Sequence, residues 1–281
     1  SYDGAGNLQN KYEQVLDLTY GYPTGTQNGN TYEYTDTSWK DKLTKVNGSN
    51  ISYDANGNPL SYRDGMSFEW ENGRILKNIN TSDKAIQMSY DSNGMRTQKT
   101  VDGVKTNYYY DSNKNLIALV KGNDTLLFYY DSDGSATSFS YNGTMYFYVK
   151  NLQGDVIRII DLAGTEVASY VYDAWGNIKD TKGEPTIREI NPIRYRGYVY
   201  DTETGLYYLQ SRYYDPFAGR FLNADAYCDT MSGSPLSTNM FAYCENDSIN
   251  YADYDGFRIT VNVKRTNNSY VLKVKLPWSD I

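Results

Sequence analysis

The chain has 281 residues, a formal net charge of −7, 31 tyrosines and no histidine. The negative charge argues against nucleic-acid binding, because phosphates would be repelled. The lack of histidine excludes His-based catalytic triads and His-ligated metals within the chain. No apolar run approaches the ~18 residues that span a bilayer, and no signal pattern opens the chain. Tyrosine favours strands, which directs attention to β structure.

One short motif recurs along the first two thirds of the chain. It reads YDGAGN from Tyr2, and further copies begin at Tyr53, Tyr90, Tyr110, Tyr130 and Tyr172. Such regular spacing is typical of stacked architectures, in which one unit cannot bury its own apolar face. The chain opens inside a copy of the motif, so we interpret it as part of a longer protein.

Each motif copy has the chemistry of a tight turn between two strands. Aspartate starts a turn by accepting hydrogen bonds from amides further along the chain, and Asn-Gly or Gly-Asn tolerates positive φ. The flanking residues alternate between apolar and polar, as in KTNYYYD before Asp111 and NLIALVKG after it. We therefore predict an all-β fold of stacked hairpins, without a long helix, in which the phased tyrosines share one face of a curved ribbon.

The repeat aspartates are interpreted as turn residues. A single carboxylate per turn, such as Asp54 or Asp91, is a weak ligand set for calcium. No cofactor or metal is therefore expected. Asp215, which precedes Pro216, is likewise interpreted as a turn residue.

The repeats resemble the YD repeats of the RHS family. The stretch RYRGYVYDTETGLYYLQSRYYDPFAGRFLNADAY, residues 194–227, is very similar to the RHS-associated core, and NMFAYCENDSINYADYDGF, residues 239–257, resembles its closing pattern. The resemblance implies a ribbon wound into a hollow shell or cocoon, which in bacteria is a container for a C-terminal toxin. A similar shell occurs in the teneurins, which are cell adhesion proteins of animals.

This resemblance divides the chain into three parts. Residues 1–193 would form the YD-repeat ribbon, residues 194–257 the RHS-associated core, and residues 258–281 a β-hairpin that begins a variable C-terminal region. The ribbon is expected to be too short to close a full cocoon, so it should either expose a concave, aromatic-lined surface or pair with neighbouring molecules through its open strand edges. The toxin would belong to the same polypeptide, and a secreted or cell-surface location in bacteria is implied.

Some RHS-core proteins cut themselves after the closing motif with two aspartates and an arginine. The matching residues here are Arg212, Asp225 and Asp253, and the implied scissile bond joins Phe257 to Arg258. The chemistry needs two close carboxylates, one protonated and one that activates water, while a guanidinium holds a carboxylate or the oxyanion. The alternative is a buried ion network that closes the end of the shell.

The chain departs from the family pattern near these residues. Tyr254 and Ala226 stand where proline is usual, and Asp247-Ser248 stands where Asn-Pro is common. We therefore expect the trio to be assembled but cleavage to be slow or absent, because proline would fix a backbone angle that Tyr254 leaves free.

Two further interpretations stay open on the sequence. Cys228 and Cys244 either form a disulfide or, as we favour, are buried free thiols. The alternative function is a cell-surface adhesion or carbohydrate-binding protein that uses the outer face of the ribbon, with glycans as partners in place of a toxin and a delivery apparatus.

Overall fold

A computed structural model describes residues 1–17, 22–226, 236, 238–256, 260–262 and 273–275. Almost every regular element in this part of the chain is a strand. The single α-helix among these residues, α1 (Pro185–Ile190), has six residues. The predicted all-β fold class is therefore confirmed.

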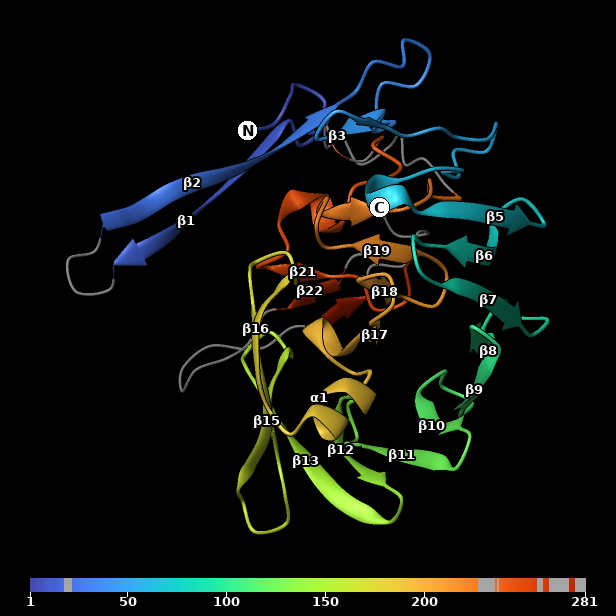
Figure 1. Ribbon diagram of the computed structural model, residues 1–281, viewed down its shortest axis with the longest axis vertical. Helices are drawn as coiled ribbons and strands as arrows, with labels where there is room; N and C mark the ends of the chain where they lie inside the picture. Colours follow the sequence, from blue (N-terminus) through green and yellow to red (C-terminus); the bar gives the residue numbers. More distant parts are fainter. Residues whose placement is uncertain (18–21, 227–235, 237, 257–259, 263–272, 276–281) are drawn as a thin grey trace.

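Twelve consecutive strands form one antiparallel sheet, in which each strand pairs with the next along the chain. They are β5 (Ser67–Glu71), β6 (Ile75–Asn80), β7 (Ala85–Tyr90), β8 (Arg96–Val101), β9 (Val104–Tyr110), β10 (Leu116–Lys121), β11 (Asp124–Tyr130), β12 (Ala136–Tyr141), β13 (Thr144–Lys150), β14 (Val156–Ile160), β15 (Glu166–Tyr172) and β16 (Ile178–Gly183). Figure 1 shows the sheet curling from β5 past β11 to β16 around later parts of the chain. This sheet is the predicted curved ribbon of hairpins.

Three smaller sheets complete the fold. The first contains β1 (Asn10–Asp17), β2 (Tyr22–Glu33), β3 (Lys45–Val46) and β4 (Ser49–Asn50). The second contains β17 (Val199–Asp201), β18 (Leu206–Tyr208), β19 (Tyr213–Asp215) and β20 (Arg220–Phe221). The third contains β21 (Tyr251–Ala252), β22 (Thr260–Asn262) and β23 (Lys273–Lys275). Short 3-10 turns lie at η1 (Arg63–Gly65), η2 (Tyr195–Gly197) and η3 (Cys244–Asn246).

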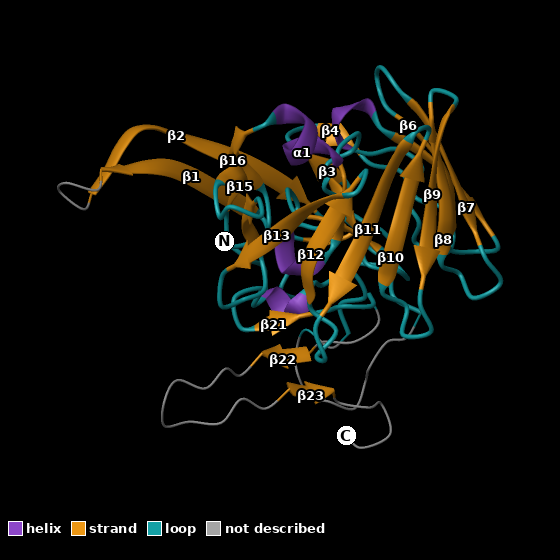
Figure 2. Ribbon diagram, turned by 90° about the horizontal axis from the view of Figure 1, so that it is seen from below, coloured by secondary structure: helices purple, strands orange, loops and turns teal. Residues whose placement is uncertain are grey.

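The views agree that the β1–β2 hairpin projects from the body of the molecule (Figures 1 and 2). At the other end of the chain, β22 pairs with β23 in antiparallel fashion. Both strands lie within residues 258–281, for which the sequence predicts a hairpin. The residues between the two strands lie outside the described part of the chain.

The turn of the YD motif is built by its aspartate. The Oδ1 atom of Asp54 accepts hydrogen bonds from the amides of Asn56 and Asn58, each at 2.9 Å, and its Oδ2 accepts from the Asn58 side chain at 2.8 Å. Gly57 takes the positive φ of 79° that the turn requires. The same pair of aspartate-to-amide bonds recurs at Asp3, Asp91, Asp111, Asp131, Asp161 and Asp173.

Removing this aspartate should therefore weaken the turn. We expect Asp54→Ala to lower the free energy of unfolding by about 1–3 kcal/mol, because it leaves turn amides without their acceptor. The control is Asp133→Ala, since the Asp133 carboxylate accepts no hydrogen bond from any residue that the structure describes. Urea unfolding monitored by tyrosine fluorescence measures both, and equal stabilities of the two variants would contradict this account of the turn.

The tyrosines that begin the regular repeats occupy equivalent places. The hydroxyls of Tyr90, Tyr110 and Tyr130 donate to the carbonyls of Leu76, Arg96 and Leu116, at 2.9, 3.0 and 2.8 Å. Each acceptor lies 14 residues before its donor. All three rings pack against buried core clusters, in agreement with the prediction that they share one face.

Later parts of the chain cover much of the inner face of the sheet. One core cluster joins side chains of β5–β8, such as Leu76, to Leu206 and Tyr213 of the second small sheet. Another joins β9–β15 to Ile187 of α1 and to Ile193. The concave surface expected from the short ribbon is thus partly filled by the chain itself.

Candidate active site

The three predicted site residues meet at one guanidinium group. Nη2 of Arg212 lies 2.9 Å from Oδ2 of Asp225 and 3.5 Å from Oδ2 of Asp253. The two carboxylate oxygens are therefore no farther apart than the sum of these distances, which is below the about 8 Å that a one-water bridge allows. Arg212 and Asp253 are buried, with 4% and 1% exposure.

Two members of the trio adjoin short strands, and the third lies in the segment after β20. Arg212 directly precedes β19, and its guanidinium lies 3.6 Å from the centre of the Phe221 ring at the end of β20. Asp225 follows four residues later, and its amide donates to the carbonyl of Met240 at 2.7 Å. Asp253 directly follows β21. Three separate segments between residues 212 and 253 thus bring the three charges to one place.

The motif Asp253-x-x-Gly256 is a turn that leads toward the predicted scissile bond. The Gly256 amide donates to Oδ1 of Asp253 at 2.9 Å. The carbonyl of Gly256 accepts a hydrogen bond from Nε of Arg212. The last described residue before Phe257 is therefore bound by two members of the trio, whereas Phe257 and Arg258 lie outside the described residues.

Gly256 cannot be replaced without strain. Its φ is +74°, and a Cβ atom added there would lie 2.5 Å from Oγ of Ser211 and 2.7 Å from the carbonyl of Leu209. We expect Gly256→Ala to lower the free energy of unfolding by about 1–3 kcal/mol, because both the backbone angle and the contacts are unfavourable. Gly94→Ala is the control, because Gly94 has a similar φ but nothing lies within 4 Å of an added Cβ. It therefore shows the effect of the backbone angle without that of the contacts. Thermal unfolding of the two variants is the measurement, and a larger loss at Gly94 would contradict this expectation.

Burial dominates the electrostatics of the site. It lowers the pKa of Arg212, although the carboxylates of Asp225 and Asp253 act in the opposite direction. The neighbouring thiol of Cys244 is buried and free, and its pKa is raised well above the ordinary value by burial and then by Asp253. Cys244 is thus an unreactive thiol at neutral pH, and Cys228 lies outside the described residues.

Asp215 has a larger role than the sequence indicated. It does make the predicted turn, since its Oδ1 accepts from the amide of Phe217 at 3.0 Å. It is also fully buried and forms a bidentate pair with Arg63, with both N–O distances 2.9 Å. The hydroxyl of Tyr62 donates to the same carboxylate at 3.0 Å. Asp215 therefore ties the start of the large sheet to β19, away from the trio.

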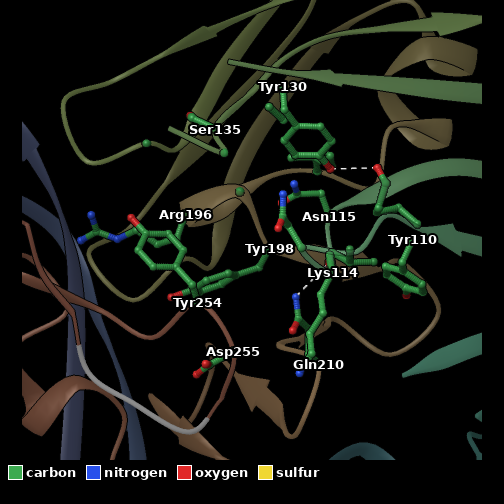
Figure 3. Close-up of a pocket in the computed structure, with 18 of the residues that line it drawn as sticks. Tyr110, Lys114, Asn115, Tyr130, Ser135, Arg196, Tyr198, Gln210, Tyr254 and Asp255 are labelled. Atoms are coloured by element: carbon green, nitrogen blue, oxygen red, sulfur yellow. Dashed lines mark hydrogen bonds between the residues drawn. The ribbon is translucent and has the colours of Figure 1, made fainter. Parts of the chain in front are cut away.

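A pocket of about 710 Å³ lies beside the trio. Its wall combines turns of the large sheet, including Lys114 and Tyr130, with Tyr198, Gln210 and Tyr254 from later in the chain. Figure 3 shows the rings of Tyr198 and Tyr254 close together, with Asp255 below them. The pocket and the trio therefore share the segment that leads to Gly256.

In the described part of the chain, no group of three or more His, Cys, Asp or Glu side chains is arranged to hold a metal ion. Within the same residues, no helix is long and apolar enough to cross a membrane.

The curled sheet of YD hairpins, packed against later parts of its own chain, is the architecture of an RHS/YD-shell protein. A family model described as the teneurin YD-shell matches residues 1–249. The chain therefore belongs to the teneurin YD-shell family.

Known proteins resemble the chain in sequence and in fold. It is 42% identical over 223 residues to the tRNA3(Ser)-specific nuclease WapA of Bacillus spizizenii and 41% identical over 223 residues to the tRNA nuclease WapA of Bacillus subtilis. These alignments cover 76% of the chain and 9% of each relative. The chain thus spans about a tenth of the length of these relatives.

Solved toxin structures share the fold. The Photorhabdus luminescens Tc holotoxin pore matches with a TM-score of 0.68 and 18% identity, over 98% of this chain and 14% of that chain. A TcdB2-TccC3-TEV crystal structure matches with a TM-score of 0.62 and 19% identity, over 92% of this chain and 15% of that chain. At these identities the similarity concerns the fold alone.

Proposed function

We propose that the chain is the closing part of a bacterial shell that encloses a C-terminal toxin region of the same polypeptide and cuts itself between Phe257 and Arg258. The observation that carries this proposal is the placement of Asp225 and Asp253 on one Arg212 nitrogen. Membership of the YD-shell family supports the shell role, and the names of the WapA relatives, which are nucleases, support the link to a toxin.

The proposed reaction is hydrolysis of one peptide bond. The ionised carboxylate of the pair takes a proton from water, and the water oxygen adds to the carbonyl carbon of Phe257. The protonated carboxyl then gives its proton to the nitrogen of Arg258, which leaves as an amine. Arg212 supports the charge on the carboxylates and, through the Gly256 carbonyl, holds the chain next to the bond.

The proposal explains why the charges are buried. Arg212 and Asp253 are buried and Asp225 is partly buried, and removing such ions from water costs several kcal/mol per ion, so the cluster is weak evidence for stability alone. A dry site strengthens every electrostatic interaction of a reaction. The departure at Tyr254 predicts cleavage that is slow or absent, and the proposal commits to slow cleavage. The same proposal implies a secreted or cell-surface location and a delivery apparatus as partner.

The test is intact mass spectrometry of the purified protein during long incubation at mildly acidic pH. We expect a piece that ends at Phe257 and a piece that begins at Arg258 to accumulate together. A chain that stays whole, or that is cut at another bond, would contradict the proposal.

A second candidate function rests on aromatic side chains of the outer face. Tyr109 is 50% exposed and Tyr129 is 42% exposed, whereas the alternating neighbours Tyr108 and Phe128 are buried in the core. Exposed rings on the outer face of the sheet can stack on sugar rings, as in the adhesion or carbohydrate-binding alternative. Wild-type binding on a glycan array that disappears in a Tyr109→Ser/Tyr129→Ser variant would favour this function. A wild-type chain that binds no glycan would contradict it.

A further inference from the structure

The hydroxyl of Tyr198 is bound to the backbone of the candidate active site. It accepts a hydrogen bond from the amide of Asp253 at 3.0 Å, and it pairs with the hydroxyl of Tyr243 at 2.9 Å. Tyr198 is buried, with 4% exposure. The Tyr243 hydroxyl therefore helps to position the Tyr198 hydroxyl, and the Tyr198 hydroxyl in turn helps to position the backbone of Asp253.

The ring of Tyr198 is held on several sides. It makes edge-to-face contacts with Tyr207, Tyr243 and Tyr254, with ring centres 6.2, 6.4 and 6.3 Å apart. Tyr254 is the residue after Asp253, so both the ring and the hydroxyl contact the same short segment. Tyr198 also lines the pocket beside the trio (Figure 3). Such packing leaves the hydroxyl little freedom to move.

The phenol of Tyr198 stays neutral in this surrounding. Burial raises its pKa well above the ordinary value, and the neighbouring Cys244 and Asp253 act in the same direction. A neutral phenol can accept from one group and share a proton with another. The contact with Asp253 therefore persists over the whole pH range in which carboxylates exchange protons.

We infer that Tyr198 is a positioning residue for self-cleavage, which holds the Asp253 backbone so that its carboxylate faces Arg212. This inference rests on the proposed function. Two hydrogen bonds fix the turn. The Tyr198 hydroxyl accepts from the amide of Asp253, and the Asp253 carboxylate accepts from the amide of Gly256. Loss of the phenol hydroxyl would release the first of these bonds, and small displacements of a catalytic group reduce rates strongly.

The test uses Tyr198→Phe, which keeps the ring and removes only the hydroxyl. We expect the first-order rate of cleavage after Phe257 to fall by about tenfold to a hundredfold. The pH–rate profile should also change, because Asp253 would no longer be held in its present position beside Arg212. Intact mass spectrometry over a pH series of the full chain gives both quantities.

The matched control is Tyr170→Phe. The buried hydroxyl of Tyr170 also makes two bonds, to the carbonyl of Arg188 at 2.7 Å and from the Asn191 side chain at 3.5 Å, and neither partner belongs to the trio. Its loss should lower the melting temperature without changing the cleavage rate or its pH profile, measured below the melting temperature of every variant.

Each outcome bears on a separate claim. A Tyr198→Phe chain that cleaves with the wild-type rate and profile would overturn the positioning role. Equal slowing in Tyr170→Phe would also overturn it, because the effect would then be a general loss of packing. If the wild-type chain is not cut, or if Asp225→Asn and Asp253→Asn are both cut at the wild-type rate, the proposed function itself fails and the inference fails with it.

Discussion

Asp225→Asn and Asp253→Asn are each expected to slow cleavage after Phe257 by about a thousandfold, within the range that general acid–base groups contribute. The amide has nearly the size of the carboxyl group but neither takes a proton from water nor gives one to the leaving amine. At Asp253 the substitution keeps an oxygen for the Gly256 amide, which now binds Oδ1 at 2.9 Å. The turn should therefore persist while the proton transfer is lost.

Asp247→Asn is the matched control for this pair. Oδ1 of Asp247 accepts from the amide of Asn250, three residues on, at 3.1 Å, as Asp253 does from Gly256. We expect its cleavage rate to equal that of the wild type. Time courses of intact mass compare the three variants, and cleavage that persists in both Asp225→Asn and Asp253→Asn would leave the ion network as the better account of the trio.

Arg96→Met should cost the largest loss of stability, about 3–5 kcal/mol, because it takes the two-point guanidinium partner from the buried Asp201 carboxylate and leaves it the single bond from Lys99. Arg96 is fully buried, and its Nη1 lies 2.5 Å from Oδ2 of Asp201. The guanidinium also stacks between rings, with its carbon 4.7 Å from the centre of Tyr108 and 4.4 Å from that of Tyr208. The pair connects β8 of the large sheet to β17, so its loss should loosen the core segment from the shell wall.

Lys45→Met is the contrasting variant. Lys45 pairs with Glu33 at 3.0 Å, but 37% and 44% of their side chains are exposed. Exposed pairs of this kind contribute about 0–1 kcal/mol. Urea unfolding of the two variants measures the difference, and equal losses would contradict the assignment of Arg96–Asp201 as the main electrostatic link between sheet and core.

The same pair predicts how stability depends on pH. Burial alone would raise the pKa of Asp201, but Arg96 and Lys99 lower it below the ordinary value. A carboxyl group whose pKa is lower in the folded state stabilises the fold above its unfolded pKa of about 3.9, and this contribution is lost as the pH falls through the folded-state pKa. The free energy of unfolding of Arg96→Met should therefore fall less than that of the wild type as the solution is made acidic.

Local features of the fold could be predicted because their causes are local. The aspartate of each YD motif binds amides two and four residues away, as Asp54 does, so the turn is visible in six residues of sequence. Alternation along each strand then indicates which side chains face inward. The spacing of Tyr90, Tyr110 and Tyr130 predicted their common face for the same reason.

The long-range contacts had no such signal. Arg63 and Asp215 are 152 residues apart, and Arg96 and Asp201 are 105 residues apart. The chain has many charged residues, and neither its composition nor their spacing indicates which two form an ion pair at such sequence separations. The meeting of Asp225 with Asp253 was likewise expected only from the resemblance to the RHS core. Asp215 was interpreted as a turn residue alone because the turn is local and its partner Arg63 is not.

The most direct test of the proposed self-cleavage is the intact mass of the wild-type protein against time, followed by identification of the new chain ends. Slow, first-order appearance of an end at Phe257 together with a start at Arg258, at a rate that does not change with protein concentration, is the predicted result. A rate that rises with concentration would indicate cutting by another molecule, and a protein that stays whole throughout would contradict the assignment of Arg212, Asp225 and Asp253 as a cleavage centre.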